Sequence, residues 1–230
     1  MVGIDRLARA AVALVAAGAV AGCSSGGDDP APDRTLLDVN EMRGALLQAT
    51  EIGPTWRAPE SPSDPSRLVS ICGGTSTAPP VPPGATVVSA PFVDEGDRGA
   101  QTLEQTALIY GDSNGAQAGL AALRAVADKC PHNVTVPATV TADRSEPAYA
   151  ESVDVQPLAQ RSWKGFVVIR HKQYEKAHPG TADSAVAMLA DRNVVLVDAY
   201  AIYRLGVASV GSQFSSDWQK LVGTVVDRVG

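Results

Sequence analysis

The chain has 230 residues, of which 45% are hydrophobic and 19% are charged, and its formal net charge at pH 7 is −6. This length and composition fit one globular domain and exclude a chain that is mainly disordered. The acidic balance also argues against a nucleic-acid-binding protein, because phosphate binding needs a cationic surface.

Residues 1–22 have the layout of a signal peptide for export. Arg6 and Arg9 give a positively charged start, and the stretch 10–22 that follows carries no charge. At about 1.5 Å per helical residue, this uncharged run is too short to span a bilayer core of about 30 Å. The sequence therefore predicts a secretory signal and not a membrane-spanning helix.

Residues 20–23 read Val-Ala-Gly-Cys and resemble a bacterial lipobox, with valine where leucine is commonest. In that motif the cysteine is lipidated and becomes the first residue of the mature protein, so the resemblance implies a lipid on Cys23. An ordinary signal peptide followed by an incidental cysteine is the alternative. We expect a lipoprotein anchored on the outer side of the cytoplasmic membrane, with that membrane as its first partner.

Residues 23–34 are predicted to be a flexible tether. The stretch from Ser24 to Pro32 reads SSGGDDPAP and contains no large apolar side chain. Segments of this composition behave as linkers and have nothing with which to build a core. A single domain is expected over residues 35–230.

The first ordered block spans residues 36–56 and is predicted to contain a helix. Asp38 or Asn40 is available as its N-cap, and Gly53-Pro54 ends it. The apolar positions with helical spacing are Leu37, Met42, Leu46 and Leu47. Residues 58–84 are then expected to form a loop, because seven of the sixteen prolines fall there.

The rest of the chain alternates between strands and two further helices. Two strands at 85–93 and 101–110 are joined by a short polar link, which favours an antiparallel hairpin. A helix is expected at 113–129, capped by Ser113, and an amphipathic helix at 214–229. The remaining strands are expected at 133–141, 152–157, 163–172, 183–191 and 194–204. Together the elements predict one α+β domain, with an antiparallel sheet packed by three helices.

Two cysteines remain if Cys23 is lipidated, namely Cys72 and Cys130. An exported chain meets oxidising conditions, so we predict that these two form a disulfide. Closing the loop between them removes on the order of 4 kcal/mol of unfolded-state entropy. Two free thiols or a metal pair are the alternatives, although neither cysteine has a nearby partner at zinc-ligand spacing.

The order of these features resembles a known family. The residues that carry the resemblance are Leu36-Leu37, Ala45-Leu46-Leu47, Trp56, Cys72, Tyr110 and Cys130, followed by a strand-rich half and a last helix with Trp218. This order is similar to that of the extracellular sensor domain of the mycobacterial serine/threonine kinase PknH and its stand-alone actinobacterial lipoprotein relatives. The resemblance covers roughly residues 35–229. It implies an α+β domain with a cleft for an unidentified extracytoplasmic ligand, and it implies no reaction. The kinase domain has two disulfides where this chain can make one.

The most catalytic-looking motif is Gly-Asp-Ser-Asn-Gly at 111–115, which matches G-x-S-x-G between a predicted strand and a predicted helix. It would make Ser113 the nucleophile of a serine hydrolase. The other triad members would be Asp143 or Asp154 and His171 or His178. Against this reading, an α/β-hydrolase needs several parallel strands before the motif, and only a hairpin precedes it. The alternative is that Ser113 only caps the helix.

A cluster of basic residues lies on the predicted strand at 163–172. Lys164, Arg170 and Lys172 share strand parity, so they belong to one face of the sheet. They are candidates for binding a small anionic ligand, such as a cell-wall fragment or a lipid headgroup, although a solvated sheet face is the alternative. The sequence contains no P-loop and no G-x-G-x-x-G, and its histidines lack zinc-ligand spacing, so no cofactor or metal is expected.

We therefore expect a membrane-anchored, extracytoplasmic lipoprotein that is not an enzyme and that acts as a ligand-binding or sensor-like module. Two alternatives stay open at this point. One is a secreted serine hydrolase with Ser113 as its nucleophile. The other is a structural or protein-interaction lipoprotein of the cell envelope.

Overall fold

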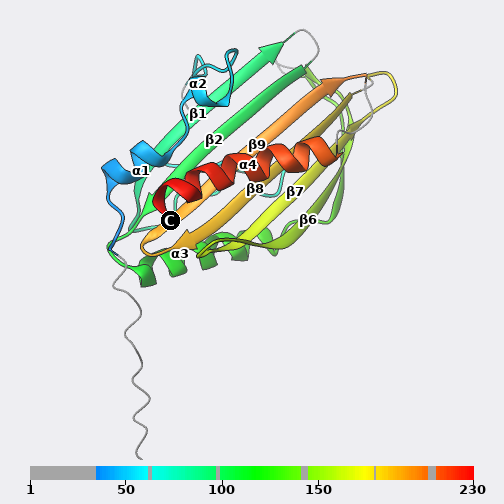
Figure 1. Cartoon of the computed structure of the whole chain (residues 1–230). Coiled ribbons are helices and arrows are strands. Elements are labelled where there is room, and N and C mark those ends of the chain that lie inside the picture. The colour runs from blue at the N-terminus through cyan, green and yellow to red at the C-terminus, as the bar shows by residue number, and fades with distance from the viewer. Residues whose placement is uncertain (1–34, 62–63, 97–98, 141–144, 179, 207–210) are drawn as a thin grey trace, which may run out of the picture. The chain divides into compact units, whose positions relative to one another are not determined.

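The computed structural model describes residues 35–61, 64–96, 99–140, 145–178, 180–206 and 211–230 (Figure 1). The predicted signal peptide (1–22), Cys23 and the predicted tether (23–34) lie outside the described residues, as does Asp143. Within the described part, no helix has both the length and the apolar character that a membrane span requires. Residues 35–230 form one compact unit.

An antiparallel sheet forms the centre of this unit. Its strand order is β1-β2-β9-β8-β7-β6-β3, and each neighbouring pair is antiparallel. The strands are β1 (Thr86–Gly96), β2 (Gly99–Ile109), β3 (Asn133–Val136), β6 (Tyr149–Gln160), β7 (Trp163–Tyr174), β8 (Gly180–Asp191) and β9 (Val194–Leu205). The short strands β4 (Thr139–Val140) and β5 (Ser145–Glu146) pair with each other in a second sheet. The predicted α+β class with an antiparallel sheet is confirmed.

Two predicted strands differ from the observed ones because of prolines. The strand expected at 133–141 is divided into β3 and β4, with Pro137 between them. The strand expected at 152–157 is too short, because β6 pairs with β7 over its whole length, through Pro157. β3 pairs with β6 only up to Ser152, so Pro157 lies on an open edge of the sheet. An edge position does not need the N–H that proline lacks.

The helices are α1 (Val39–Ala45), the single turn α2 (Ala49–Ile52), α3 (Ser113–Ala127) and α4 (Gly211–Val229). The helix predicted at 36–56 is divided into α1 and α2, because the N–H of Leu47 donates to the side chain of Gln105 on β2 instead of continuing the helix. Asp38 caps α1 with a capping box, as one of the two predicted candidates. The cap of α3 is Asp112, whose carboxylate accepts from the Gly115 N–H at 2.8 Å, and the predicted cap Ser113 is the first helical residue.

Helices cover both faces of the sheet, so the core has two layers (Figure 1). The face under α4, called the α4 face, also carries α1. Its buried side chains include Leu103, Leu196, Tyr200, Phe214, Trp218 and Val222. The opposite face, called the α3 face, packs α3 and the loop residues 68–71. Its buried side chains include Leu68, Ile71, Leu123, Phe166, Val186 and Met188.

The turn between β8 and β9 binds the start of the domain. The buried side chain of Asn193 accepts from the N–H of Leu37 at 2.8 Å and donates to the carbonyl of the same residue at 3.0 Å. Its amide nitrogen also donates to the carbonyl of Tyr110, the residue that follows β2. One side chain therefore joins three separate parts of the chain.

The disulfide between Cys72 and Cys130 is present, with Cα atoms 5.0 Å apart, which confirms the predicted pairing. Cys130 lies just beyond the end of α3, and Cys72 lies in the proline-rich loop. The bond therefore fixes that loop to the helix on the α3 face.

Candidate functional site

A cavity of about 290 Å³ lies on the α3 face, beyond the part of the sheet that α3 covers. Its floor is made by β1, β2, β7, β8 and β9. Its walls include Pro59, Ser61, Val69 and Ser70 of the proline-rich loop. Because α3 packs against Phe166 and Met188, further along the same strands, no helix fills this region.

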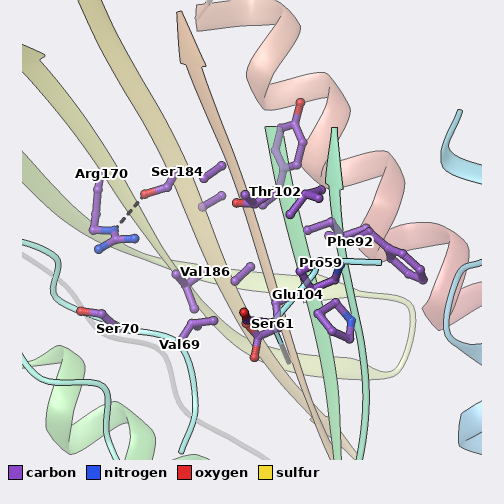
Figure 2. A pocket seen from close by; sticks show the side chains of 17 residues that line it. Pro59, Ser61, Val69, Ser70, Phe92, Thr102, Glu104, Arg170, Ser184 and Val186 are labelled. Atoms are coloured by element: carbon purple, nitrogen blue, oxygen red, sulfur yellow. Dashed lines mark hydrogen bonds between the residues drawn. The ribbon is translucent and has the colours of Figure 1, made fainter. Parts of the chain in front are cut away.

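The floor of the cavity consists of two rows of side chains that the strand register places next to each other. The first row is Arg170, Ser184, Ala201 and Thr102, on β7, β8, β9 and β2. The second row is Val186, Ala199 and Glu104, on β8, β9 and β2. Figure 2 shows Arg170 and Ser184 towards one end of the cavity and Pro59, Ser61 and Phe92 towards the other. The cavity therefore has a cationic end and an apolar middle.

Arg170 is the most distinctive residue of the cavity. Its side chain is only 15% exposed, and its Nε donates to the Ser184 hydroxyl at 2.9 Å. Its Nη1 lies 4.0 Å from Oε1 of Glu151, which is the outer limit of an ion pair. Desolvation lowers the pKa of Arg170, and the nearby Glu151 carboxylate acts in the opposite direction. The protein therefore holds the desolvated cation of Arg170 at the cavity, with the Glu151 carboxylate too far away for a hydrogen bond.

Glu151 links Arg170 to the loop that carries the disulfide. Its Oε2 accepts from the N–H of Gly74 at 2.6 Å, and its buried Oε1 has no hydrogen-bond partner among the described residues. At Gly73 the backbone has φ +68°, and a Cβ there would lie 2.3 Å from Oε1 of Glu151 and 2.7 Å from Nη1 of Arg170. Only glycine fits this close approach. The loop backbone therefore lies directly against the two charged groups.

The three predicted basic residues lie on the same face of β7 but do not converge. Lys172 donates to Glu146 at 3.3 Å, and its ammonium lies 4.1 Å from the centre of the Tyr149 ring. Lys164 is exposed and lies six residues from Arg170 along the strand, which corresponds to roughly 20 Å. Of the three, Arg170 alone lines the cavity.

The structure does not place Ser113 in a catalytic triad. Ser113 is exposed on the first turn of α3, which follows the end of β2 that pairs with Val194. His171 lies opposite Asp183, which itself pairs with Ile202 on β9. Val194 and Ile202 are eight residues apart on β9, so Ser113 and His171 lie at positions about 26 Å apart along the strand direction.

The other proposed triad members that the structure describes have partners of their own or lie at the surface. Nδ1 of His171 lies 2.7 Å from Oδ1 of Asp183, and Asp154 accepts from Gln156. His178 is exposed. The hydrolase interpretation based on Ser113 is therefore wrong, because the residues that it needs are far apart.

Ser152 stands opposite His171 in the register, so Ser152, His171 and Asp183 form a row across three strands of the α4 face. β6 is paired on both sides at Ser152, with β3 and with β7. Its backbone N–H groups are therefore committed to the sheet and cannot form an oxyanion hole. Among the described residues there is also no group of three or more metal-ligating side chains.

Sequence reasoning missed Glu151, Gly73 and Ser184. A signal for Glu151 existed, because it shares strand parity with the buried Val153 and is an acidic residue at an inward position. The predicted strand began one residue after it. Gly73 and Ser184 gave no such signal, since their importance comes from residues on other strands.

Comparisons with known proteins give one structural likeness. No family model matches the chain, and no curated protein matches it. The crystal structure of the extracellular domain of PknH from Mycobacterium tuberculosis matches with a TM-score of 0.53 and 15% sequence identity, over 85% of this chain and 98% of that one. At this identity the likeness concerns the fold alone, and the chain therefore has the fold of an extracellular domain of a kinase.

Proposed function

We propose that this protein is a lipid-anchored, extracytoplasmic lipoprotein whose domain binds a ligand in the α3-face cavity, without catalysing a reaction. The lipobox-like residues that end at Cys23 support the anchor. The disulfide between Cys72 and Cys130 suits an oxidising compartment. The fold likeness to an extracellular kinase domain supports a sensor-like role.

The cavity with the buried Arg170 is the observation that carries the binding part of this proposal. If this part of the α3 face were purely structural, an apolar side chain at position 170 would stabilise it more than an arginine. The neighbouring Val168 and Val186 are buried apolar residues of this kind. Instead, the chain keeps a desolvated guanidinium beside a cavity of about 290 Å³. Ligand sites commonly combine an apolar lining with a few polar groups in this way.

A protein-interaction role has less support. The exposed large hydrophobic residues of the described part are Leu36, Val140 and Leu205, which belong to different segments of the chain. Interaction surfaces instead tend to collect such residues in one contiguous patch.

Thermal denaturation of the mature chain carrying Cys23→Ser, with cell-wall fragments and extracted envelope lipids added one at a time, tests ligand binding. Filling the cavity by Ala201→Phe should abolish any stabilisation by a bound fragment, whereas Ala159→Phe at an exposed position of β6 should preserve it. If no fraction raises Tm, or if the filled variant responds like the unmodified domain, the binding proposal is wrong. The anchor is tested separately, because Cys23→Ser should move the full chain from the membrane fraction to the soluble one.

A further inference from the structure

Arg170 offers more hydrogen-bond donors than the protein uses. A guanidinium has five N–H groups in a planar fork. Among the described residues, the only hydrogen bond it makes runs from Nε to Ser184, because the 4.0 Å separation from Glu151 exceeds hydrogen-bonding distance. Nη1 lies beside Glu151 and the Gly73 backbone, whereas Nη2 has no hydrogen-bond partner among the described residues, so Arg170 keeps unused donors where it lines the cavity.

Glu151 does not neutralise this cation at close range. Its Oε2 is bound to the N–H of Gly74, and the glycine backbone at residue 73 lies against both charged groups. The carboxylate is thus oriented by the loop and not by the guanidinium. A ligand carboxylate or phosphate could accept a charge-assisted N–H bond from Nη2 of Arg170. Ser184, whose oxygen accepts from Arg170, keeps its own hydroxyl proton for such an anion.

The rest of the cavity has an apolar middle and several polar side chains around it. Its apolar side chains include Val69, Pro91, Val186 and Ala199, and its polar side chains include Ser61, Ser70, Thr102 and Glu104. Glu104 lies three strands away from Arg170 and in the neighbouring row, at roughly 16 Å. One water molecule occupies about 30 Å³ in the liquid, so a cavity of about 290 Å³ has room for roughly ten non-hydrogen atoms.

We propose that the ligand of this cavity is an anionic amphiphile, whose carboxylate or phosphate binds Arg170 and whose short aliphatic chain lies along Val186 and Ala199 towards Pro91. This inference rests on the proposed function, since it names the ligand class of the same cavity. Octanoate, which has ten non-hydrogen atoms, is a suitable probe, and octanamide is its uncharged isostere.

Isothermal titration of the mature chain carrying Cys23→Ser compares the two probes. We expect octanoate to bind at least tenfold more tightly than octanamide. Arg170→Gln should remove this preference, whereas Lys164→Gln should preserve it, because Lys164 lies on the same face of the same strand but far from the cavity. Ser184→Ala, which leaves both charges of the cluster in place, should weaken octanoate binding several-fold and leave octanamide unchanged.

Each outcome decides the inference. Equal binding of the two probes, or a preference that survives Arg170→Gln, overturns the anionic ligand class while the proposed binding function stands. Failure of both probes to bind also overturns this ligand class, and thermal denaturation with cell-wall fragments and envelope lipids then decides the proposed function independently. If Arg170→Gln does not fold, Ser184→Ala decides the inference. Weaker octanoate binding with unchanged octanamide binding supports an anionic ligand at Arg170, and unchanged octanoate binding overturns it.

Discussion

Asp198 should make the stability of the domain depend on pH near neutrality. It lies in the centre of β9 on the α4 face, and it is only 1% exposed. Its Oδ2 accepts from Nε2 of Gln105 at 2.7 Å, while the buried Oδ1 has no partner among the described residues. Burial raises the pKa of Asp198 to about 7, against a smaller lowering by the hydrogen bond from Gln105.

The sign and size of the effect follow from proton linkage. The folded domain binds this proton more tightly than the unfolded chain, whose aspartate titrates near pH 4. The free energy of unfolding therefore falls as pH rises from about 4 through about 7, and it stays low above that. A shift of about 3 pKa units corresponds to about 4 kcal/mol, which is an upper limit because local relaxation reduces the cost.

Asp198→Asn removes this titration and keeps the shape of the side chain. We expect the variant to be more stable than the unmodified domain by about 2–4 kcal/mol at pH 8 and to differ little at pH 4.5. Urea denaturation at the two pH values measures the difference, and Asp154→Asn at an exposed position of β6 is the control. A stability difference that does not change with pH, or a variant that is less stable at pH 8, would refute the assignment of a buried, destabilising carboxylate.

Three further changes test the loop and the helix cap. Gly73→Ala should cost about 1–3 kcal/mol in the free energy of unfolding, because a Cβ there meets Glu151 at a backbone φ of +68°. The control Gly111→Ala should cost much less, because there is open space around Gly111. Equal losses in the two variants would contradict the close approach of the Gly73 backbone to Glu151. Reducing the disulfide should lower the free energy of unfolding by about 2–5 kcal/mol in thermal or urea denaturation, and an unchanged Tm would show that the loop holds without it. Asp112→Ala should cost about 1 kcal/mol through the loss of the α3 cap, while Ser113→Ala should be nearly neutral, and the reverse order in urea denaturation would restore Ser113 as the cap.

Periodicity along the chain was enough to predict the fold class, because most elements bury a regular face. The last helix is one example, since Phe214, Trp218 and Val222 were expected on one stripe and are all buried. The division of the first helix could not be predicted in this way. It depends on Gln105, a residue 58 positions away that takes the N–H of Leu47. Local propensity carries no information about such a partner.

The candidate site was predictable only in part, for a related reason. Strand parity placed Arg170 on one face together with Lys164 and Lys172, and the register agrees with that placement. Parity does not say which of these residues meets a cavity, because that depends on where α3 ends and where the proline-rich loop crosses the sheet. Glu151 and Gly73 come close to Arg170 only after three segments have packed together.

The side chain of Asn193 also determines how the domain responds to mechanical load. Because it holds both backbone groups of Leu37, tension applied at the first residues is passed into the turn between β8 and β9. The bond to Tyr110 shares that tension with β2. Both β2 and β9 are paired on both sides, so neither can be peeled from an edge of the sheet. A pull at this end therefore loads the two hydrogen bonds between Leu37 and Asn193 first, and the strands behind them are each held by a ladder on both sides.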